Sequence, residues 1–336
     1  RETRALPSWG SAFFTKIQIR MEGRFVHMKD AAAPRPKKKS KYWNSETLSY
    51  QAMLLPGIIL LIIFIVIPLF GLVIAFQNYV PAKGIFGSEW VGLENFEYMF
   101  LIPDSMQVFW NTIVIAVAKI IAGIIVPVIF ALLLNEAKNV LFKKTVQTVV
   151  YMPYFLSWVI LGSIFQAMLS LDGPINAIIQ MLGGEPIMFL GSNDWFRSII
   201  VITDTWKNFG YGAIVYLAAL LAIDPNLYEA AAIDGAGRFR QLINITLPAL
   251  VPTIVLMTTL SLGNVLNAGF DQVFNMYNAM VYETGDIIDT YVYRMGLIDM
   301  QYSLSTAVGL LKSIVSSILI ILSYTLARKF AGYRIF

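Results

Sequence analysis

The sequence has no cysteine and a single histidine, His27, and each shortage excludes a kind of chemistry. A chain without cysteine has no disulfide, no thiol nucleophile and no thiolate metal site. With its one histidine in a polar tail, the chain also lacks the usual histidine metal clusters and triads. No glycine-rich loop ends in Gly-Lys-Ser or Gly-Lys-Thr, so the chain cannot cradle nucleotide phosphates itself. The inventory argues against an enzyme and against a metal or cofactor bound by this chain.

Charged residues are scarce as well. They make up 14% of the 336 residues, whereas 57% are hydrophobic, and the mean hydropathy is +0.66. This composition predicts an all-α integral membrane protein that crosses the bilayer several times. Eleven of the 25 lysines and arginines gather in residues 1–51, a polar tail that we expect to be flexible and cytoplasmic. The uneven distribution of basic residues therefore indicates membrane topology rather than a nucleic-acid partner.

Apolar runs long enough to span a bilayer, which takes about twenty residues, fill the predicted membrane domain, residues 52–336. We predict six transmembrane helices, at residues 52–76, 109–134, 145–169, 197–223, 248–270 and 304–327. The proposed inner loops and the C-terminus hold eight lysines and arginines, and the outer loops hold two, Lys83 and Arg294. The positive-inside rule then predicts that both termini are cytoplasmic.

One polar stretch, residues 224–247, stands between the fourth and fifth predicted spans on the cytoplasmic side. Asp224 can cap a helix, Pro225 suits its first position, and Gly235 can end it in a left-handed conformation. Glu229 and three alanines lie between these signals. The short helix predicted here is too small to build its own core and is suited to lie in a groove of another protein.

The same stretch resembles the signature loop of ABC-importer membrane subunits. Glu229-Ala230-Ala231 is followed after three residues by Gly235, and after nine more by Ile245, one residue, and Leu247-Pro248. The resemblance implies a type I importer permease in which this loop is the coupling helix that docks into a cytoplasmic ATPase. The residues that it would assign to this link are Glu229, Ala230, Ala231, Asp234 and Gly235. The alternative is an ordinary capped interfacial helix whose alanines serve helix propensity.

A second resemblance covers residues 50 to 336. Trp90-Val91-Gly92-Leu93-Glu94-Asn95-Phe96 is similar to sugar-importer permeases, and the segment 270–313 resembles the branch for complex oligosaccharides and polysaccharide fragments. The resemblance implies a multi-pass protein of the bacterial plasma membrane. It also implies a second related permease, two ATPase subunits that bind ATP and Mg, an external substrate-binding protein and a carbohydrate substrate.

Ionisable side chains inside the predicted spans are costly unless they are paired or hydrated. They are Lys119, Asp204, Lys207 and Lys312. Asp204 and Lys207 are three residues apart, so we predict that they share a helix face and pair with each other. These groups indicate a hydrophilic path or a gate between subunits; the alternative is interhelical ion pairing, or lysines that reach for the interface.

A sugar path needs aromatic faces and hydrogen-bonding groups in an apolar pocket. The predicted lining is Tyr151, Tyr154, Trp158, Trp206, Asn208, Tyr211, Asn264 and Asn267. Any single aromatic residue among them can instead pack spans together or anchor them at an interface. Asn264 and Asn267 are the stronger candidates, because we expect them on one face of the fifth span, where an amide facing lipid is costly.

The predicted function is therefore the membrane-spanning permease of an ATP-driven importer of oligosaccharides or polysaccharide fragments. One alternative is a secondary transporter driven by protons through Asp204 and Lys207. Another is a membrane scaffold or sensor, and importers of a simple sugar, phosphate ester or peptide also remain open.

Overall fold

The computed structural model describes residues 45–331, and side chains over residues 49–325. Residues 1–44 of the predicted tail lie outside this range. The chain divides after Leu69 into two compact units. The described part of the first unit is one apolar helical run, made of α2 (Ser45–Leu61), the π-helix η1 (Ile62–Val66) and α3 (Ile67–Leu69).

The second unit, residues 70–336, is helical apart from two short strands in its described part. It begins with η2 (Phe70–Phe76), and the strands β1 (Gln77–Asn78) and β2 (Glu89–Trp90) form an antiparallel pair. Its remaining elements before the coupling loop are α4 (Gly84–Gly87), α5 (Glu94–Leu101), α6 (Pro103–Glu136), α7 (Val140–Tyr151), η3 (Met152–Phe155), α8 (Trp158–Leu169), α9 (Pro174–Met181), η4 (Phe189–Gly191) and α10 (Asn193–Leu221). From the coupling loop onward they are α11 (Pro225–Ile233), α12 (Arg238–Gln241), η5 (Leu242–Thr246), α13 (Leu247–Leu262), α14 (Phe270–Met276), η6 (Ala279–Val281), α15 (Tyr282–Gly285), α16 (Ile288–Tyr293), η7 (Arg294–Ile298) and α17 (Tyr302–Ala331).

The predicted all-α membrane fold is confirmed. Five segments of the described chain are helical, long and apolar enough to cross a membrane: Ser49–Phe76, Pro103–Glu136, Trp158–Met181, Arg238–Leu262 and Tyr302–Thr325. The pair α10 and α11, bent by 65° where they meet, makes a sixth if it is counted as one span. The helices α6, α10 and α17 overlap the predicted spans 109–134, 197–223 and 304–327.

The third predicted span, 145–169, is not one continuous helix. The α-helix α7 ends at Tyr151, a short 3₁₀ turn follows, and α8 begins at Trp158. Pro153 lacks an amide hydrogen and so disfavours continuation of α7, and the hydroxyl of Ser157 caps α8 by accepting from Ile160 N at 3.4 Å. This interruption between α7 and α8, residues 152–157, is called the first break below.

The fifth predicted span, 248–270, is also interrupted. The helix α13 ends at Leu262, and residues 263–269 form turns and irregular backbone before α14 begins. Glycines stand at both ends of this segment, and Gly269 has a φ of +93°, a left-handed conformation that side chains other than glycine rarely adopt. Residues 263–269 are called the second break.

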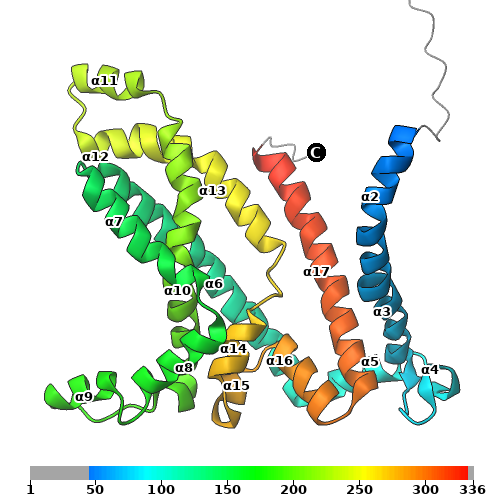
Figure 1. The fold of residues 1–336 in the computed structure, drawn as a ribbon. Helices are drawn as coiled ribbons and strands as arrows, with labels where there is room; N and C mark the ends of the chain where they lie inside the picture. The colour runs from blue at the N-terminus through cyan, green and yellow to red at the C-terminus, as the bar shows by residue number, and fades with distance from the viewer. Residues whose placement is uncertain (1–44, 332–336) are drawn as a thin grey trace, which may run out of the picture. The chain divides into compact units, whose positions relative to one another are not determined.

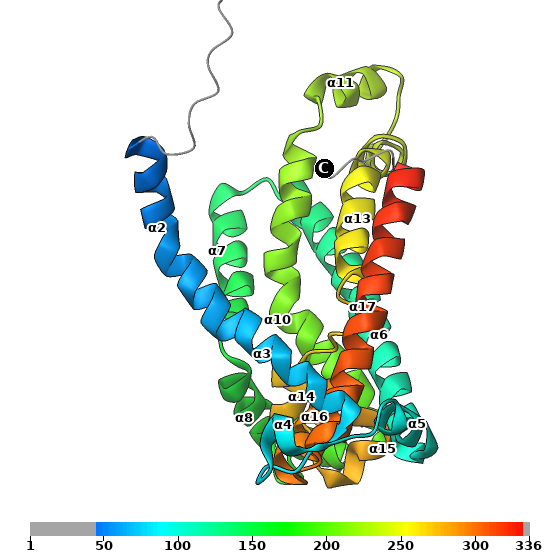
Figure 2. The same ribbon diagram turned by 90° about the vertical axis from the view of Figure 1, so that its right-hand side faces the viewer.

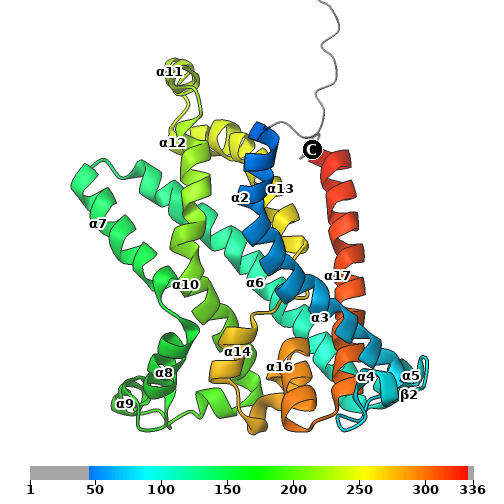
Figure 3. The same ribbon diagram turned by 45° about the vertical axis from the view of Figure 1, so that its right-hand side comes forward.

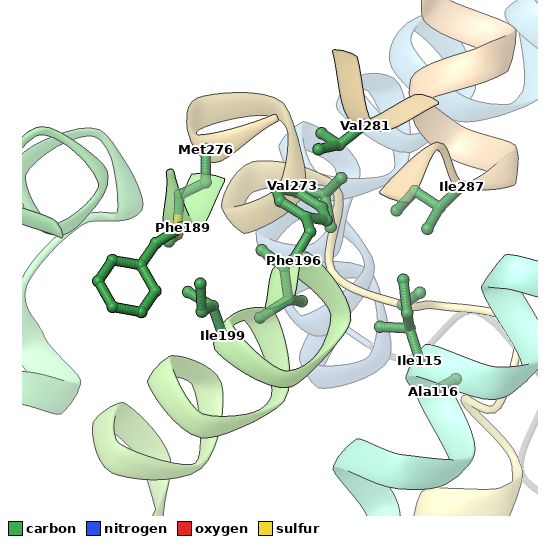
Figure 4. Close-up of a cluster of buried hydrophobic side chains, with 11 residues drawn as sticks. Ile115, Ala116, Phe189, Phe196, Ile199, Val273, Met276, Val281 and Ile287 are labelled. Carbon is green, nitrogen blue, oxygen red and sulfur yellow. The ribbon is translucent and has the colours of Figure 1, made fainter. Parts of the chain in front are cut away.

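Within the second unit, α10 lies against α6 and runs between two opposite ends of the unit, one marked by α11 and the other by α15 (Figures 1 and 2). Figure 3 shows α9 at the end opposite α11. At the α15 end, Phe196 and Ile199 of α10 pack with Val273 of α14 in a buried apolar cluster (Figure 4). A second buried cluster joins α6, α10 and α13 near the α11 end. Ala268 and Val265 belong to the first cluster, so these contacts pack the second break against neighbouring helices.

Candidate functional site

The short helix α11 is built by the local signals that predicted it. An Oδ1 oxygen of Asp224 accepts from the amide of Asn226 at 3.0 Å, and Pro225 occupies the first turn. At the other end, Gly235 has a φ of +77°, Ala236 N donates to Ala231 O at 2.8 Å, and the amide of Gly235 donates to a carbonyl one turn back at 3.1 Å. This pair of bonds is the Schellman pattern, which terminates a helix and satisfies its last carbonyls.

The outer surface of α11 is uncovered in this chain. Of the residues assigned to the ATPase link, Glu229, Ala230, Asp234 and Gly235 are exposed and Ala231 is half-buried. Large apolar side chains beside them are exposed too, with Ile233 87% exposed and Phe239 75% exposed. A polar loop that also presents such apolar groups is typical of a surface that receives another protein.

Two side-chain contacts fasten this loop to the membrane helices. The hydroxyl of Tyr228 lies 3.0 Å from Oγ1 of Thr246, at the point where η5 meets α13. Nε2 of Gln241 donates to Ala236 O at 3.1 Å. Sequence reasoning did not identify these anchoring residues, because the contacts join positions without a recognisable spacing. They make α11 part of a loop whose movement would be passed to α13.

Two cavities lie on either side of the second break. The larger, of about 830 Å³, is lined by residues of the break and of α16 and α17; the smaller, of about 380 Å³, is lined by the break, α6, α10 and α13. Asn264 and Asn267 line both. The second break thus contributes side chains to the lining of both cavities.

The expectation that Asn264 and Asn267 lie on one face of a helix is wrong. Both belong to the irregular segment after α13. Nδ2 of Asn264 makes one long contact, 3.4 Å to Leu260 O, whereas the side-chain amide of Asn267 has no hydrogen-bond partner among the described residues. The exposed side chain of Asn267 is therefore available to a solute in either cavity.

The aromatic lining differs from the predicted one. Phe270, Tyr293 and Tyr302 line the larger cavity. They lie in or beside the segment that was assigned to an external loop, so sequence reasoning passed over them. Of the predicted path residues in the described chain, six lie outside the linings of both cavities: Tyr151, Tyr154, Trp158, Trp206, Asn208 and Tyr211.

Several of these aromatic residues contact one another or the neighbouring helices. The rings of Tyr154 and Tyr211 stack with centroids 3.9 Å apart, which joins the first break to α10. Trp206 meets Phe165 of α8 edge to face, with centroids 5.6 Å apart. Pairs in these geometries stabilise helix packing.

The predicted pair between Asp204 and Lys207 is wrong. Oδ1 of Asp204 lies 3.6 Å from Nζ of Lys119, on the neighbouring helix α6. Nζ of Lys207 instead donates to carbonyl oxygens of the first break, at 2.9 Å to Tyr154 O and also to Leu156 O, and it lies over the ring of Trp158. The carbonyl oxygens at the end of the interrupted helix bind the ammonium group of Lys207 in place of the carboxylate of Asp204, one turn away on the same helix.

The fourth intramembrane charge also has a partner. Lys312 of α17 forms an ion pair with Asp289 of α16, and both line the larger cavity. Lys119 and Asp204 line the smaller one. Each cavity therefore contains one described lysine and one described aspartate, which balance in charge.

Next to the larger cavity, a buried ion pair fixes the approach to α16. Oδ2 of Asp286 accepts from Nη2 of Arg294 at 2.5 Å, and its other oxygen accepts from Oγ1 of Thr290 at 2.7 Å. Burial raises the pKa of Asp286 above its ordinary value, and the bonds from Arg294 and Thr290 oppose that shift. The guanidinium also stacks on Tyr282, 4.2 Å from the ring centroid. This cluster fixes the turn that leads into α16.

The family model described as "Binding-protein-dependent transport system inner membrane component" matches residues 123–332, a range that includes α11 and both breaks. The chain belongs to this family. The predicted family resemblance is therefore confirmed, and the permease is a membrane transport subunit rather than an enzyme.

Similar proteins of known name are transport permeases. The permease is 46% identical to the polygalacturonan/rhamnogalacturonan transport system permease protein YteP of Bacillus subtilis (strain 168), over 84% of this chain and 89% of that protein. It is 45% identical to Protein LplB of the same organism, over 83% of this chain and 88% of that protein. It also resembles a chain in the crystal structure of a bacterial ABC transporter involved in the import of the acidic polysaccharide alginate. That match has a TM-score of 0.78 and 34% identity, and covers 85% of this chain and 96% of the other.

Proposed function

We propose that the permease is one of two related membrane subunits of an ABC importer that takes up oligosaccharides or polysaccharide fragments. The names of two relatives support this cargo class. One is a polygalacturonan/rhamnogalacturonan transport permease, and the other belongs to a transporter involved in alginate import. The solved alginate transporter in complex with an alginate pentasaccharide-bound periplasmic protein supports an external binding protein as the donor of cargo. Acidic fragments are thus the first candidates to test.

The observation that carries the proposal is the pair of side-chain amides, Asn264 and Asn267, that lines both cavities. A volume of about 830 Å³ lies within the range of small-molecule sites, roughly 300–1,000 Å³. Asn264, Asn267 and Thr306 offer hydrogen-bonding groups for sugar hydroxyls, and Phe270 and Tyr293 offer ring faces for the C–H surface of a sugar. Such a lining suits a polar solute with apolar faces better than an inorganic ion.

The coupling function is assigned to α11. One of two partner ATPases, which bind ATP and Mg, would receive the exposed surface around Glu229 on the cytoplasmic side, and this chain would bind no cofactor. Closure of the ATPases would then carry α11 with them, and the contacts from Tyr228 and Gln241 would pass the displacement to α13. The spans would rock between outward-open and inward-open states, with both termini in the cytoplasm.

The test is the ATPase activity of the complete transporter, purified in lipid with its partner subunits, with and without loaded binding protein. We expect stimulation by binding protein loaded with one class of fragment, for example oligogalacturonate, and none by the unloaded protein. The matched control is a neutral oligosaccharide of equal length. Lack of stimulation by every oligosaccharide would contradict the cargo class. Uptake that survives ATPase inactivation but stops with a proton uncoupler would instead support the secondary transporter.

A further inference from the structure

A single lysine holds the second break in place. Lys119 comes from α6, and its side chain is 10% exposed. Its ammonium group donates to the carbonyl oxygen of Ala268 at 2.6 Å and to Oε1 of Gln272, and it lies 3.6 Å from Oδ1 of Asp204. An ammonium group has three N–H donors, and three oxygens surround it here. Lys119 therefore links the break to α6, α10 and α14 at once.

The amide of Gln272 continues this network into α10. The side chain is fully buried, and its Nε2 donates to Ile200 O and to Oγ1 of Thr203, both at 2.8 Å. Since its Oε1 already accepts from Lys119, both ends of the amide are engaged. A fully satisfied buried network fixes one arrangement of its members.

Gly269 lets the lysine reach this position. A Cβ atom on Gly269 would lie 2.9 Å from Nζ of Lys119, closer than real Cβ contacts, and the φ of +93° would strain any other residue. The glycine thus leaves room for the ammonium group beside the carbonyl of Ala268.

The break needs such a donor. Irregular backbone at membrane depth is tolerated only where it is buried in protein or lines a cavity, because its polar groups need partners, and Lys119 supplies the partner of Ala268 O. We propose that Lys119 is a positioning residue that fixes residues 263–269 through Ala268 O, and so sets where the amides of Asn264 and Asn267 stand in the two cavities. Its effect on transport rests on the proposed function, whereas its effect on the break does not.

The chain contains its own matched control. Lys207 does for the first break what Lys119 does for the second, because it donates to Tyr154 O and Leu156 O. A general loss of membrane-protein stability would loosen both breaks in either variant. A positioning role predicts that Lys119→Met loosens residues 263–269 and that Lys207→Met loosens residues 152–157. Asp204→Asn separates the carbonyl contact from the ion pair, since it keeps Lys119 and its bond to Ala268.

Hydrogen–deuterium exchange of the assembled transporter in lipid nanodiscs measures this directly. Amides inside the second break are hydrogen-bonded, among them Asn264 N to Ser261 O at 3.0 Å and Asn267 N to Asn264 O at 2.8 Å. In Lys119→Met we expect these amides to exchange about tenfold faster, because a charge-assisted bond to the break is lost. In Lys207→Met and in Asp204→Asn they should exchange as in the wild type. Uptake by Lys119→Met should fall in parallel.

Unchanged exchange over residues 263–269 in Lys119→Met would overturn the proposal, as would equal acceleration in Asp204→Asn. Should Lys119→Met fail to assemble, Lys119→Gln, which removes the charge and shortens the side chain without changing the backbone of the break, must accelerate the same amides. The expected exchange pattern in a transporter that moves no glycan would support the positioning role and refute the proposed function. Normal exchange together with normal glycan uptake in the variant would refute the positioning role and leave the proposed function standing.

Discussion

Replacing Gly235 with aspartate should block ATP-coupled uptake while the chain still inserts into the membrane. The chain itself tolerates the change, because a Cβ atom on Gly235 meets no other atom within 4 Å. The cost lies in the backbone, where a φ of +77° strains a residue with a side chain by about 1–2 kcal/mol. Aspartate is among the non-glycine residues that adopt a positive φ most readily, so the strain of Gly235→Asp is at the lower end of this range, about 1 kcal/mol.

A free-energy change of about 1 kcal/mol corresponds to a factor of about five in an equilibrium. Such a shift cannot by itself abolish transport by a well-folded loop. A loss of uptake much larger than fivefold would therefore indicate disturbed docking, because the new carboxylate would clash with the partner ATPase. The assay is uptake of labelled oligosaccharide, together with ATPase activity and co-purification of the partner subunits.

Gly235→Ala is the matched control, since it adds the backbone strain without charge or bulk. Alanine carries the full backbone strain of about 1–2 kcal/mol, so we expect Gly235→Ala to keep between about a fifth and a thirtieth of wild-type uptake, and Gly235→Asp to fall well below Gly235→Ala although its own strain is smaller. Undiminished uptake in Gly235→Asp would refute the docking role of this loop. Equal losses in both variants would assign the effect to the helix end instead.

Three other substitutions test the membrane part. Asn267→Leu should lower uptake about two- to tenfold, because it removes one hydrogen bond to the cargo, which contributes about 0.5–1.5 kcal/mol. Unchanged uptake would show that Asn267 does not line the path. Lys312→Met should lower the thermal midpoint by leaving Asp289 unpaired, and the added change Asp289→Leu should recover part of it, since paired sites are not additive. Gly210→Ala places a Cβ 2.5 Å from a backbone oxygen of α7 and should destabilise the protein by about 1–3 kcal/mol, whereas an unshifted midpoint would contradict this close packing.

The helix α11 could be predicted because its signals are local. Asp224, Pro225 and Gly235 act on neighbouring backbone groups, and the structure has a helix from Pro225 to Ile233 between them. Membrane-spanning character could also be predicted, since length and apolarity decide it. Both inferences depend on residues close together in the chain.

The ion pairs could not be predicted, because their partners are distant in sequence. The spacing of three between Asp204 and Lys207 describes only their own helix, whereas Lys207 donates to Tyr154 O and Asp204 pairs with Lys119 of α6. Which group a buried charge chooses depends on helix packing.

The second break left a weaker signal that was available. Gly263-Asn264 and Asn267-Ala268-Gly269 are clusters of turn-forming residues inside an apolar run. Hydropathy favoured a continuous helix there, and the turn chemistry prevailed in the structure.

The helix α10 has a mechanical consequence. Its 29 residues, with no proline among them, extend about 43 Å at 1.5 Å per residue. One end leads directly into α11, and at the other Phe196 packs against Gly285 while Nε of Arg197 donates to Thr284 O at 3.0 Å. A helix of this length is suited to act as a stiff strut, so part of a displacement of α11 would pass along α10 to α15, beside the part that Tyr228 and Gln241 would pass to α13.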